Sequence, residues 1–411
     1  MQFIKQSARS CPKVSLILLD WSVRESFHLF HYLSEQDVDR DLFEVIIIEY
    51  YSRMSDAIRL FEDQVDSWLM LEMPEDCYYH KHLMYNAGIV YAKGDICVIC
   101  DSDAMVKPGF IRSIITEFES YPNTVLHIDQ FRNSRKDFYP FAYPDFSEVT
   151  GRGCSNNVDG KTRGLVDDRD PIHNRNYGAC MCARRNDLIA IGGADEHTDY
   201  LGHICGPYDM TFRLVNLGHR EIWHQTEFTY HTWHPGQAGE DNYLGPHDGR
   251  HVSTTALDAL ISGRTMPLEE NESIRNIRLA TTPAQGIDTF RIDPIHLLAW
   301  QRDKLCIEKQ WVAGDSTRKV WRGYVIDQTT NGFVAYPRFL EHPEFSKFKD
   351  KFEIHTSTKA DLYERLNGSI PFRLRLVFPV VTLLTYVSSA FGLTSLYLRR
   401  RWGRLTHEAH S

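Results

Sequence analysis

Short, almost unbroken apolar runs recur in the first quarter of the chain, with amphipathic segments between them. Residues 14–19, 43–48 and 96–100 are too short for helices and are typical of strands that are buried on both faces. Residues 25–36 and 86–92 have helical patterns. The alternation of strand and helix predicts an α/β protein with a mostly parallel, twisted sheet flanked by helices.

The third apolar run leads directly into two carboxylates, Asp101 and Asp103. Ligands of open α/β sheets bind beyond the carboxyl ends of the strands, and two adjacent carboxylates repel each other unless a cation or a proton joins them. Oxygen ligands suit Mg²⁺ or Mn²⁺, which usually also bind substrate phosphates. The pattern predicts a metal and diphosphate site. A solvated Asp-Ser-Asp turn is the alternative.

Composition narrows the class of protein. A chain of 411 residues suggests two or more domains, and a net charge of −9 argues against nucleic acid as a partner. The cysteines have no disulfide-framework spacing, and Cys97, Cys100, Cys180 and Cys182 lie in strand-like segments. We interpret them as small buried apolar residues, which suits a reducing cytosol.

The two ends of the chain differ. The first apolar run is too short for a signal peptide and is followed by Asp20. Residues 376–398 carry no charge and have arginines on both sides. That length can span a bilayer, although the hydroxyls, Pro379 and Gly392 in it also suit an interfacial or buried helix. We expect a cytoplasmic protein that associates with the inner face of a membrane through residues 371–411.

The later patterns are weaker. Residues 123–178 are polar and glycine-rich and predict a long loop region, of the kind that often carries substrate contacts. A strand at 179–183, a helix at 209–217 and a short strand at 221–223 follow. Residues 255–370 are mixed and charged, and we expect an appended region of helices and loops.

Three groups of segments, in this order, resemble the inverting family 2 glycosyltransferases of the GT-A fold. The first is the two opening strands with the residues that follow them. The second runs from Asn86 to Asp103. The third comprises residues 177–185, 191–196 and 209–214. The similarity covers roughly residues 12–235.

The resemblance implies a domain organisation and an activity. Residues 1–254 would form the GT-A domain, with a nucleotide-binding half at about 12–110 and an acceptor half at about 111–254. The enzyme would be a metal-dependent inverting glycosyltransferase, using Mn²⁺ or Mg²⁺ and a nucleotide-sugar donor such as a UDP-sugar. The acceptor would be a glycan or lipid-linked glycan in capsule or O-antigen biosynthesis.

The resemblance also implies roles for residues at the strand ends. Asp103 would bind the metal directly, and Asp101 would contact the ribose, or the metal through water. Glu49 would reach the nucleotide base or ribose. Asp20 and Trp21 would line the base pocket, with ordinary core packing as the alternative for Trp21.

Further donor-site residues are expected from other segments. His82 and Asn86 fall where the family places polar residues near the donor, although Asn86 could instead cap a helix. His231 is the preferred third metal ligand and His234 the second choice, because a neutral imidazole binds Mn²⁺. Surface histidines are the alternative. Arg250 could pair with phosphate oxygens.

The catalytic base departs from the family pattern. Relatives usually carry an acidic pair before the helix of Arg213, and the usual base position falls on Pro207. Asp209 is the nearest carboxylate and is our expected base, with a helix N-cap as the alternative. Asp195 and Glu196 are the second choices.

Three rival functions have different support in the sequence. A non-catalytic binding protein on this fold is favoured by Pro207. A nucleotidyltransferase would need a glycine-rich phosphate loop after the first strand, and residues 20–25 contain no glycine. A zinc hydrolase would need His-Glu-x-x-His spacing, which the chain lacks.

Overall fold

The computed structural model describes most of the first three hundred residues and separate pieces of the rest. The described residues are 1–20, 26–164, 176–201, 207–235, 254–280, 290–299, 301, 318–321, 324–329, 332–337, 353–358 and 362. The chain forms two compact units, Met1–Arg302 and Asp303–Ser411. Within the described residues no helix has the length and apolar character needed to cross a membrane. Trp21, Arg250 and the apolar segment 376–398 lie outside these residues.

An eight-stranded sheet forms the centre of the first unit. Its strands in spatial order are β1 (Gln2–Lys5), β4 (Ser67–Met73), β3 (Phe43–Tyr51), β2 (Val14–Asp20), β5 (Ile96–Cys100), β10 (Cys180–Arg184), β6 (Thr124–His127) and β11 (Arg220–Trp223). β2 runs parallel to β3 and β5, β3 to β4, and β6 to β11. Only β1 and β10 pair antiparallel within it. The predicted mostly parallel α/β sheet is confirmed.

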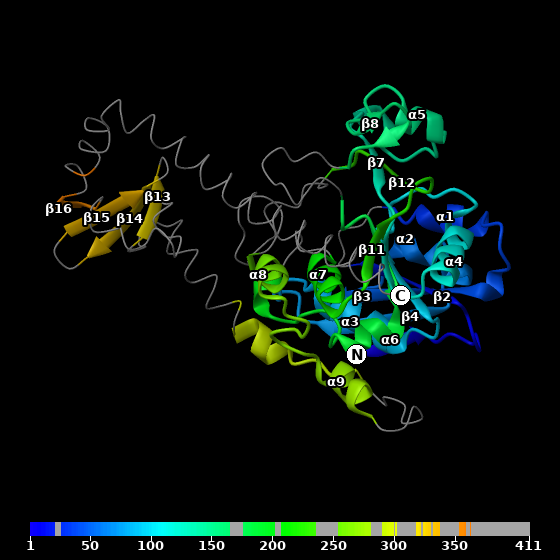
Figure 1. The fold of residues 1–411 in the computed structure, drawn as a ribbon, viewed down its shortest axis with the longest axis horizontal. Helices are drawn as coiled ribbons and strands as arrows, with labels where there is room; N and C mark the ends of the chain where they lie inside the picture. The colour runs from blue at the N-terminus through cyan, green and yellow to red at the C-terminus, as the bar shows by residue number, and fades with distance from the viewer. Residues whose placement is uncertain are drawn as a thin grey trace, which may run out of the picture. The chain divides into compact units, whose positions relative to one another are not determined.

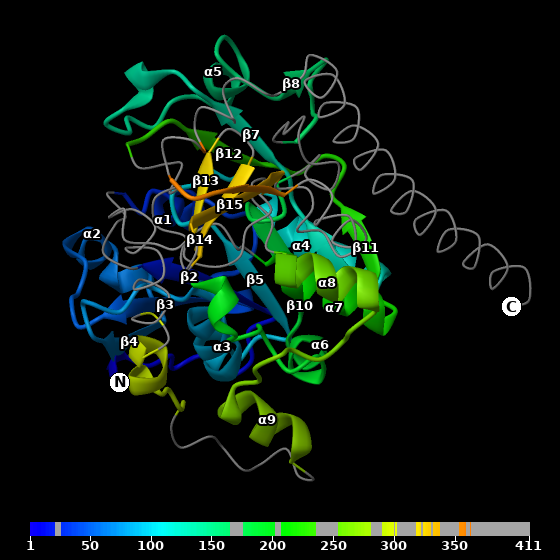
Figure 2. The same cartoon turned by 90° about the vertical axis from the view of Figure 1, so that its left-hand side faces the viewer.

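Helices cover both faces of this sheet (Figures 1 and 2). One face packs against α1 (Leu29–Ser34), α2 (Asp56–Arg59) and α4 (Phe110–Ser120). Helix α5 (Phe146–Thr150) packs on a separate two-stranded sheet. The other packs against α3 (Lys81–Tyr91), α6 (Arg185–Ala190) and α7 (Tyr208–Leu217). Helix α9 (Glu272–Leu279) packs on α3 and α6. Helix α8 (Thr254–Ser262) packs on α7. Successive β2 residues, Leu18 and Leu19, join opposite clusters, which explains the unbroken apolar run.

Short 3₁₀ turns complete the unit. They are η1 (Arg40–Leu42), η2 (Glu62–Gln64), η3 (Lys136–Phe138) and η4 (Thr198–Tyr200). Helix α3 lies close against β2, because Gly88 has no Cβ that would overlap the side chain of Ile17. The helix begins five residues before Asn86, so the alternative that Asn86 caps it is wrong. The four cysteines expected to be buried are buried and lie outside disulfides.

The expected long loop at 123–178 is wrong for its described residues. Besides β6, this region contains β7 (Gln130–Asn133), α5, β8 (Asn157–Val158) and β9 (Lys161–Thr162). β7 pairs in parallel with β12 (Thr229–Thr232), and β8 pairs with β9. These strands have at most four residues and many polar side chains. Their local pattern therefore carries no strand signal.

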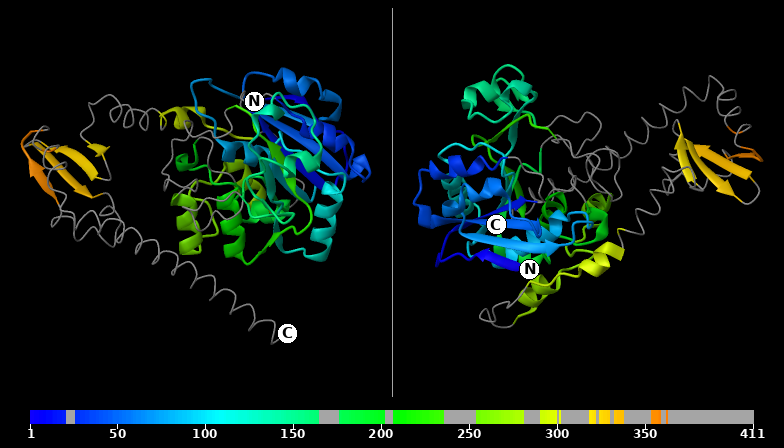
Figure 3. Two further views of the ribbon diagram at one scale, coloured as in Figure 1. Left: turned by 90° about the horizontal axis from the view of Figure 1, so that it is seen from above. Right: turned by 180° about the vertical axis from the view of Figure 1, so that it is seen from behind.

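The second unit contains a four-stranded antiparallel sheet (Figure 3). Its strands are β13 (Arg318–Trp321), β14 (Tyr324–Thr329), β15 (Gly332–Pro337) and β16 (Ile354–Thr356). We expected helices and loops here, and for these strands that expectation is wrong. Neighbouring residues such as Val325 and Ile326 are both buried, so the alternation that marks a strand is absent.

Candidate active site

The acid pair lies in a packed turn at the carboxyl end of β5. The backbone N–H of Asp101 donates to the carbonyl of Ala179 (3.3 Å), and that of Leu29 donates to the carbonyl of Ser102 (3.2 Å). Ser102 and Asp103 are buried, and Asp101 is half-buried. The alternative of a solvated turn is therefore wrong, since both neighbouring segments hold the backbone in place.

Two histidines, one in β12 and one just after it, contact this turn. Met105 and Tyr230 exchange backbone hydrogen bonds of 2.8 and 2.9 Å, which fixes β12 beside the turn. His231 Nε2 consequently lies 3.7 Å from Asp103 Oδ1, and His234 Nε2 lies 3.1 Å from Asp103 Oδ2. One ligand atom from each of the three residues lies within 4.8 Å of the others. Asp101 does not belong to this cluster.

The hydrogen bonding of His234 indicates what the cluster can bind. Its Nδ1 lies 2.8 Å from the carbonyl oxygen of Pro235, which can only accept, so Nδ1 carries the hydrogen. In the neutral ring, Nε2 then presents a lone pair to the carboxylate of Asp103. Two lone pairs at 3.1 Å repel unless a cation or a proton lies between them. The residues therefore fit a divalent metal ion, and one carboxylate with two imidazoles suits Mn²⁺ better than Mg²⁺.

The expected nucleotide contacts Asp20 and Glu49 lie side by side at the ends of β2 and β3. Both are nearly fully buried. Glu49 Oε1 accepts hydrogen bonds from the backbone of Ser55 (3.0 Å) and from Trp68 Nε1 (2.8 Å). Burial raises the pKa of Glu49 to about 7, and these two hydrogen bonds oppose it. Sequence reasoning missed Trp68, whose role depends on the fold.

His82 and Asn86 bind protein groups in the interior. His82 Nδ1 lies 2.8 Å from the carbonyl of Asp195, and its ring stacks on Tyr200. Asn86 donates to the carbonyl of Ala194 and to Glu196, at 2.9 Å each, and accepts from the backbone of Ala194. Neither side chain has exposed surface. The expected contact of these two residues with the donor stays a prediction.

Asp209 lies inside the protein as well. Arg213 donates to Asp209 Oδ2 through Nε (2.9 Å) and Nη2 (2.6 Å), and the Tyr200 hydroxyl donates to Oδ1 (3.1 Å). Burial alone would raise the pKa of Asp209, but the charge and hydrogen bonds of Arg213 outweigh it and hold the pKa below its usual value. An enclosed, ion-paired carboxylate is a poor proton acceptor. The helix N-cap is Pro207, so that alternative for Asp209 is wrong.

The two second choices for the base differ in exposure. Asp195 is fully buried and accepts hydrogen bonds from the backbone of His197, Leu268 and Glu269. Glu196 is only half-buried. Asn86 and Asn271 both donate to its Oε1, at 2.9 and 2.8 Å. Burial raises the pKa of Glu196 to about 8, against the lowering effect of the two amides.

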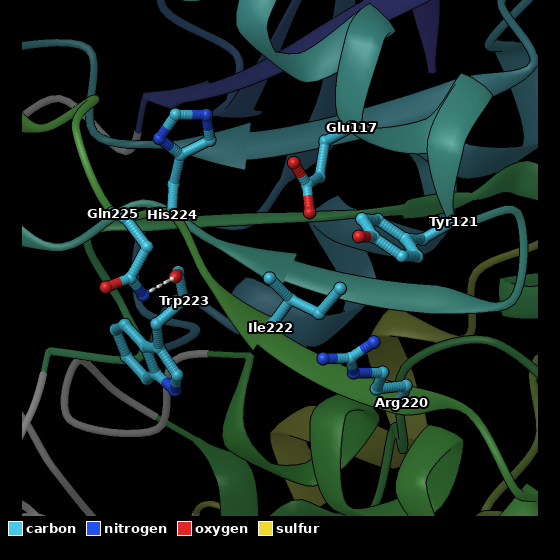
Figure 4. A pocket seen from close by; sticks show the side chains of 7 residues that line it. All are labelled: Glu117, Tyr121, Arg220, Ile222, Trp223, His224 and Gln225. Carbon is cyan, nitrogen blue, oxygen red and sulfur yellow. Dashed lines mark hydrogen bonds between the residues drawn. The ribbon is translucent and has the colours of Figure 1, made fainter. Parts of the chain in front are cut away.

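A hollow of about 280 Å³ lies elsewhere, at the edge strand β11 and the end of α4 (Figure 4). It is lined by Glu117, Tyr121, Arg220, Ile222, Trp223, His224 and Gln225. β11 pairs with β6 and is separated from β5 by two strands. None of the residues predicted from the sequence lines this hollow, so it is not part of the candidate active site.

Comparison with known families identifies the domain that carries the acid pair. Residues 29–187 match the family described as "Glycosyl transferase family 2". Residues 29–187 therefore correspond to a family 2 glycosyltransferase domain, as the sequence resemblance implied. No curated protein matches the chain by sequence.

Several solved structures are similar to the chain. Staphylococcus aureus TarS 1-349 is 15% identical with a TM-score of 0.37, and the match covers 54% of this chain and 60% of that one. The same protein in complex with UDP-GlcNAc is 13% identical with a TM-score of 0.42, covering 78% and 97%. A mannosyltransferase from Pyrobaculum calidifontis in complex with GDP-Man and Mn²⁺ is 15% identical with a TM-score of 0.35, covering 74% and 83%. The first match thus spans less than two thirds of its relative.

Proposed function

We propose that the protein transfers a sugar from a nucleotide diphosphate sugar, preferably a UDP-sugar, to a hydroxyl group. The transfer inverts the configuration of the sugar and uses a divalent metal ion. The observation that carries this proposal is the cluster of Asp103, His231 and His234. It lies at the carboxyl end of β5, within the residues that match the glycosyltransferase family. Ligands of such sheets bind at this edge.

A divalent ion held by this cluster would stabilise the negative charge that develops on the leaving diphosphate. Asp101, next to the cluster, would contact the ribose or hold the ion through water. Asp20 and Glu49 would face the nucleoside from the neighbouring strands. The acceptor hydroxyl attacks the anomeric carbon from the face opposite the diphosphate, which inverts the configuration.

Among the three carboxylates considered as base, Glu196 has the properties that proton transfer requires. The residue is half-buried, whereas Asp195 and Asp209 are fully buried. Its pKa of about 8 lies near neutral pH, where a general base is most effective. Asp209 and Asp195 would act as positioning residues. Asp209 binds Arg213, which donates to the carbonyls of Ile191 and Gly193 after α6. Asp195 binds Arg264 and the backbone N–H of Leu268.

We also propose a place for the reaction. The acceptor would be a glycan or lipid-linked glycan of a cell-surface polysaccharide, such as capsule or O-antigen, at the inner face of a membrane. The support is the uncharged run 376–398 between arginines. A chain that lacks residues 376–411 should stay in solution when mixed with anionic vesicles, and the full chain should float with them. A full chain that also stays in solution would refute this location.

The donor site is tested by thermal stabilisation with a panel of sugar nucleotides, with Mn²⁺ and with chelator. A ligand that binds only the folded state raises the unfolding midpoint. The wild type should respond to one nucleotide in the presence of metal, and Asp103→Asn should not. Asp63→Asn, on an exposed 3₁₀ turn, is the matched control. An equal shift in Asp103→Asn would refute the metal site.

A second candidate function is a non-catalytic binding protein on the same fold. It is favoured by Pro207 at the usual base position and by the enclosure of Asp209. Such a protein would show the metal-dependent shift but would neither transfer nor hydrolyse the donor sugar. Release of nucleoside diphosphate over time separates the two functions.

A further inference from the structure

Arg132 lies beside the metal-ligand cluster, on a strand that the sequence did not predict. It belongs to β7, and its register partner in the parallel pair with β12 is His231. Paired residues of adjacent strands project from the same face of a sheet. The guanidinium and the imidazole of His231 therefore start from neighbouring positions and point to the same side.

The backbone of Arg132 is fixed. Its N–H donates to Asn156 Oδ1 (2.9 Å), and its carbonyl accepts from the backbone N–H (2.9 Å) and hydroxyl (3.1 Å) of Ser155. The position of the strand beside β12 is thus set on both edges. The side chain extends from a rigid support and not from a loop.

Arg132 is half-buried, and the carboxylate of Asp101 lies in its surroundings. Burial lowers the pKa of Arg132, and the charge of Asp101 raises it, so the guanidinium lies within electrostatic reach of Asp101. Among the described residues, no side-chain hydrogen bond or ion pair holds its five N–H groups. A half-buried guanidinium without hydrogen-bond acceptors is unfavourable, so a ligand with several anionic oxygens would stabilise it.

We propose that Arg132 binds the diphosphate of the donor, which would lie between its guanidinium and the metal ion. This inference rests on the proposed function. A divalent ion at Asp103 and His231 would put two more positive charges next to the guanidinium, and their repulsion favours an anion between them. A diphosphate has enough oxygens to bind both, and the planar guanidinium matches phosphate oxygens in pairs. In this position Arg132 stabilises the leaving group as the sugar departs.

A purely structural charge interaction with Asp101 is the competing explanation. In that case Arg132 would only neutralise Asp101, and its removal would change folding but not the affinity for diphosphate. The two explanations predict different effects of an Arg132 substitution on the affinity for a small diphosphate ligand. Inorganic pyrophosphate is such a probe.

The experiment is calorimetric titration of the full chain with UDP, GDP and inorganic pyrophosphate in Mn²⁺. Arg132→Met should bind the diphosphate ligands about 10- to 100-fold more weakly than wild type, which is the usual effect of losing charge-assisted hydrogen bonds. The affinity of Arg132→Lys for these ligands should lie between those of Arg132→Met and the wild type, because lysine keeps the charge but cannot form paired hydrogen bonds. Arg135→Met is the control, since Arg135 pairs with Asp137 at the surface. Affinity for Mn²⁺ alone should not fall in any variant.

The outcomes separate this inference from the proposed function. If Arg132→Met binds diphosphates as the wild type does while Asp103→Asn does not, the Arg132 assignment is overturned and the donor site stands. If the wild type binds pyrophosphate through Arg132 but no nucleotide, the anion site stands and the donor proposal fails. If the wild type binds no diphosphate at all, both fail. If Arg132→Met does not fold, the comparison of Arg132→Lys with wild type decides.

Discussion

Asp209 and Arg213 form an ion pair one turn apart in α7, with neither side chain exposed to solvent. Arg213 also donates to the carbonyls of Ile191 and Gly193 (2.5 Å each) and so joins α7 to the segment after α6. The pair therefore has a structural role, since it links α7 to the segment after α6. Asp209 lies two residues after Pro207, the usual position of the base, and this proximity explains why the sequence suggested Asp209 for that role.

Asp209→Asn should destabilise the protein more than it changes chemistry. It leaves a buried guanidinium without its counter-ion, which typically lowers the free energy of unfolding by about 3–5 kcal/mol. Urea denaturation measures this loss, with the exposed Asp159→Asn as the control. A variant as stable as wild type that binds donor but transfers no sugar would restore Asp209 as the base.

His231→Ala and His234→Ala should each lower the affinity for Mn²⁺ at least tenfold, since loss of even an indirect partner of a metal site typically has about that effect. The sequence ranked His234 second, but its Nε2 is the nearer of the two to Asp103. Both variants should be measured by titration of Mn²⁺ into the protein, with the exposed His355→Ala as the control. Unchanged affinity in either variant would remove that histidine from the site.

Glu196→Gln should abolish transfer and leave donor binding intact. If Glu196 takes the acceptor proton, the wild-type rate should rise with pH and level off above its pKa of about 8. The rate is measured as a function of pH alongside the nucleotide-induced thermal shift. Exposed Glu119→Gln is a suitable control. A flat pH profile with full activity in Glu196→Gln would leave the base unassigned.

Glu49 should make stability depend on pH. Its pKa rises from the ordinary value of 4.5 to about 7 on folding, so between these values the folded state holds a proton that the unfolded state has lost. The free energy of unfolding should therefore fall as pH rises from about 4.5 to about 7, by on the order of 3 kcal/mol. Urea midpoints at pH 5 and pH 7.5 should differ more in wild type than in Glu49→Gln. Parallel midpoints in the two proteins would contradict this shift.

Elements buried on both faces could be predicted from the sequence. β2, β3 and β5 are continuous apolar runs because helices cover both sides of the sheet. β7 could not be predicted, because it is held by polar contacts: Asn133 Nδ2 donates to the carbonyl of Val149, and Asn156 accepts from Arg132. Such contacts join residues far apart in the chain and leave no local periodicity.

The residues of the candidate site also differ in how far the sequence predicts them. Asp103 and His231 could be predicted, because each belongs to a recognisable segment. Arg132 could not, since its place beside His231 depends on the register of two strands from distant parts of the chain. The prediction that Asp209 is the base rests on a carboxylate near the expected place. The sequence does not show that this carboxylate is enclosed and ion-paired with Arg213.

The bridge between Met105 and Tyr230 brings together ligands that are separated by more than a hundred residues of chain. An ion bound there would act as a reversible cross-link that closes a long loop, and closing a long loop restricts the unfolded chain more than closing a short one. Removal of metal should therefore loosen the attachment of the segment around β12 before it affects β2 or β5. Protease cleavage between β11 and α8 would then report on metal occupancy.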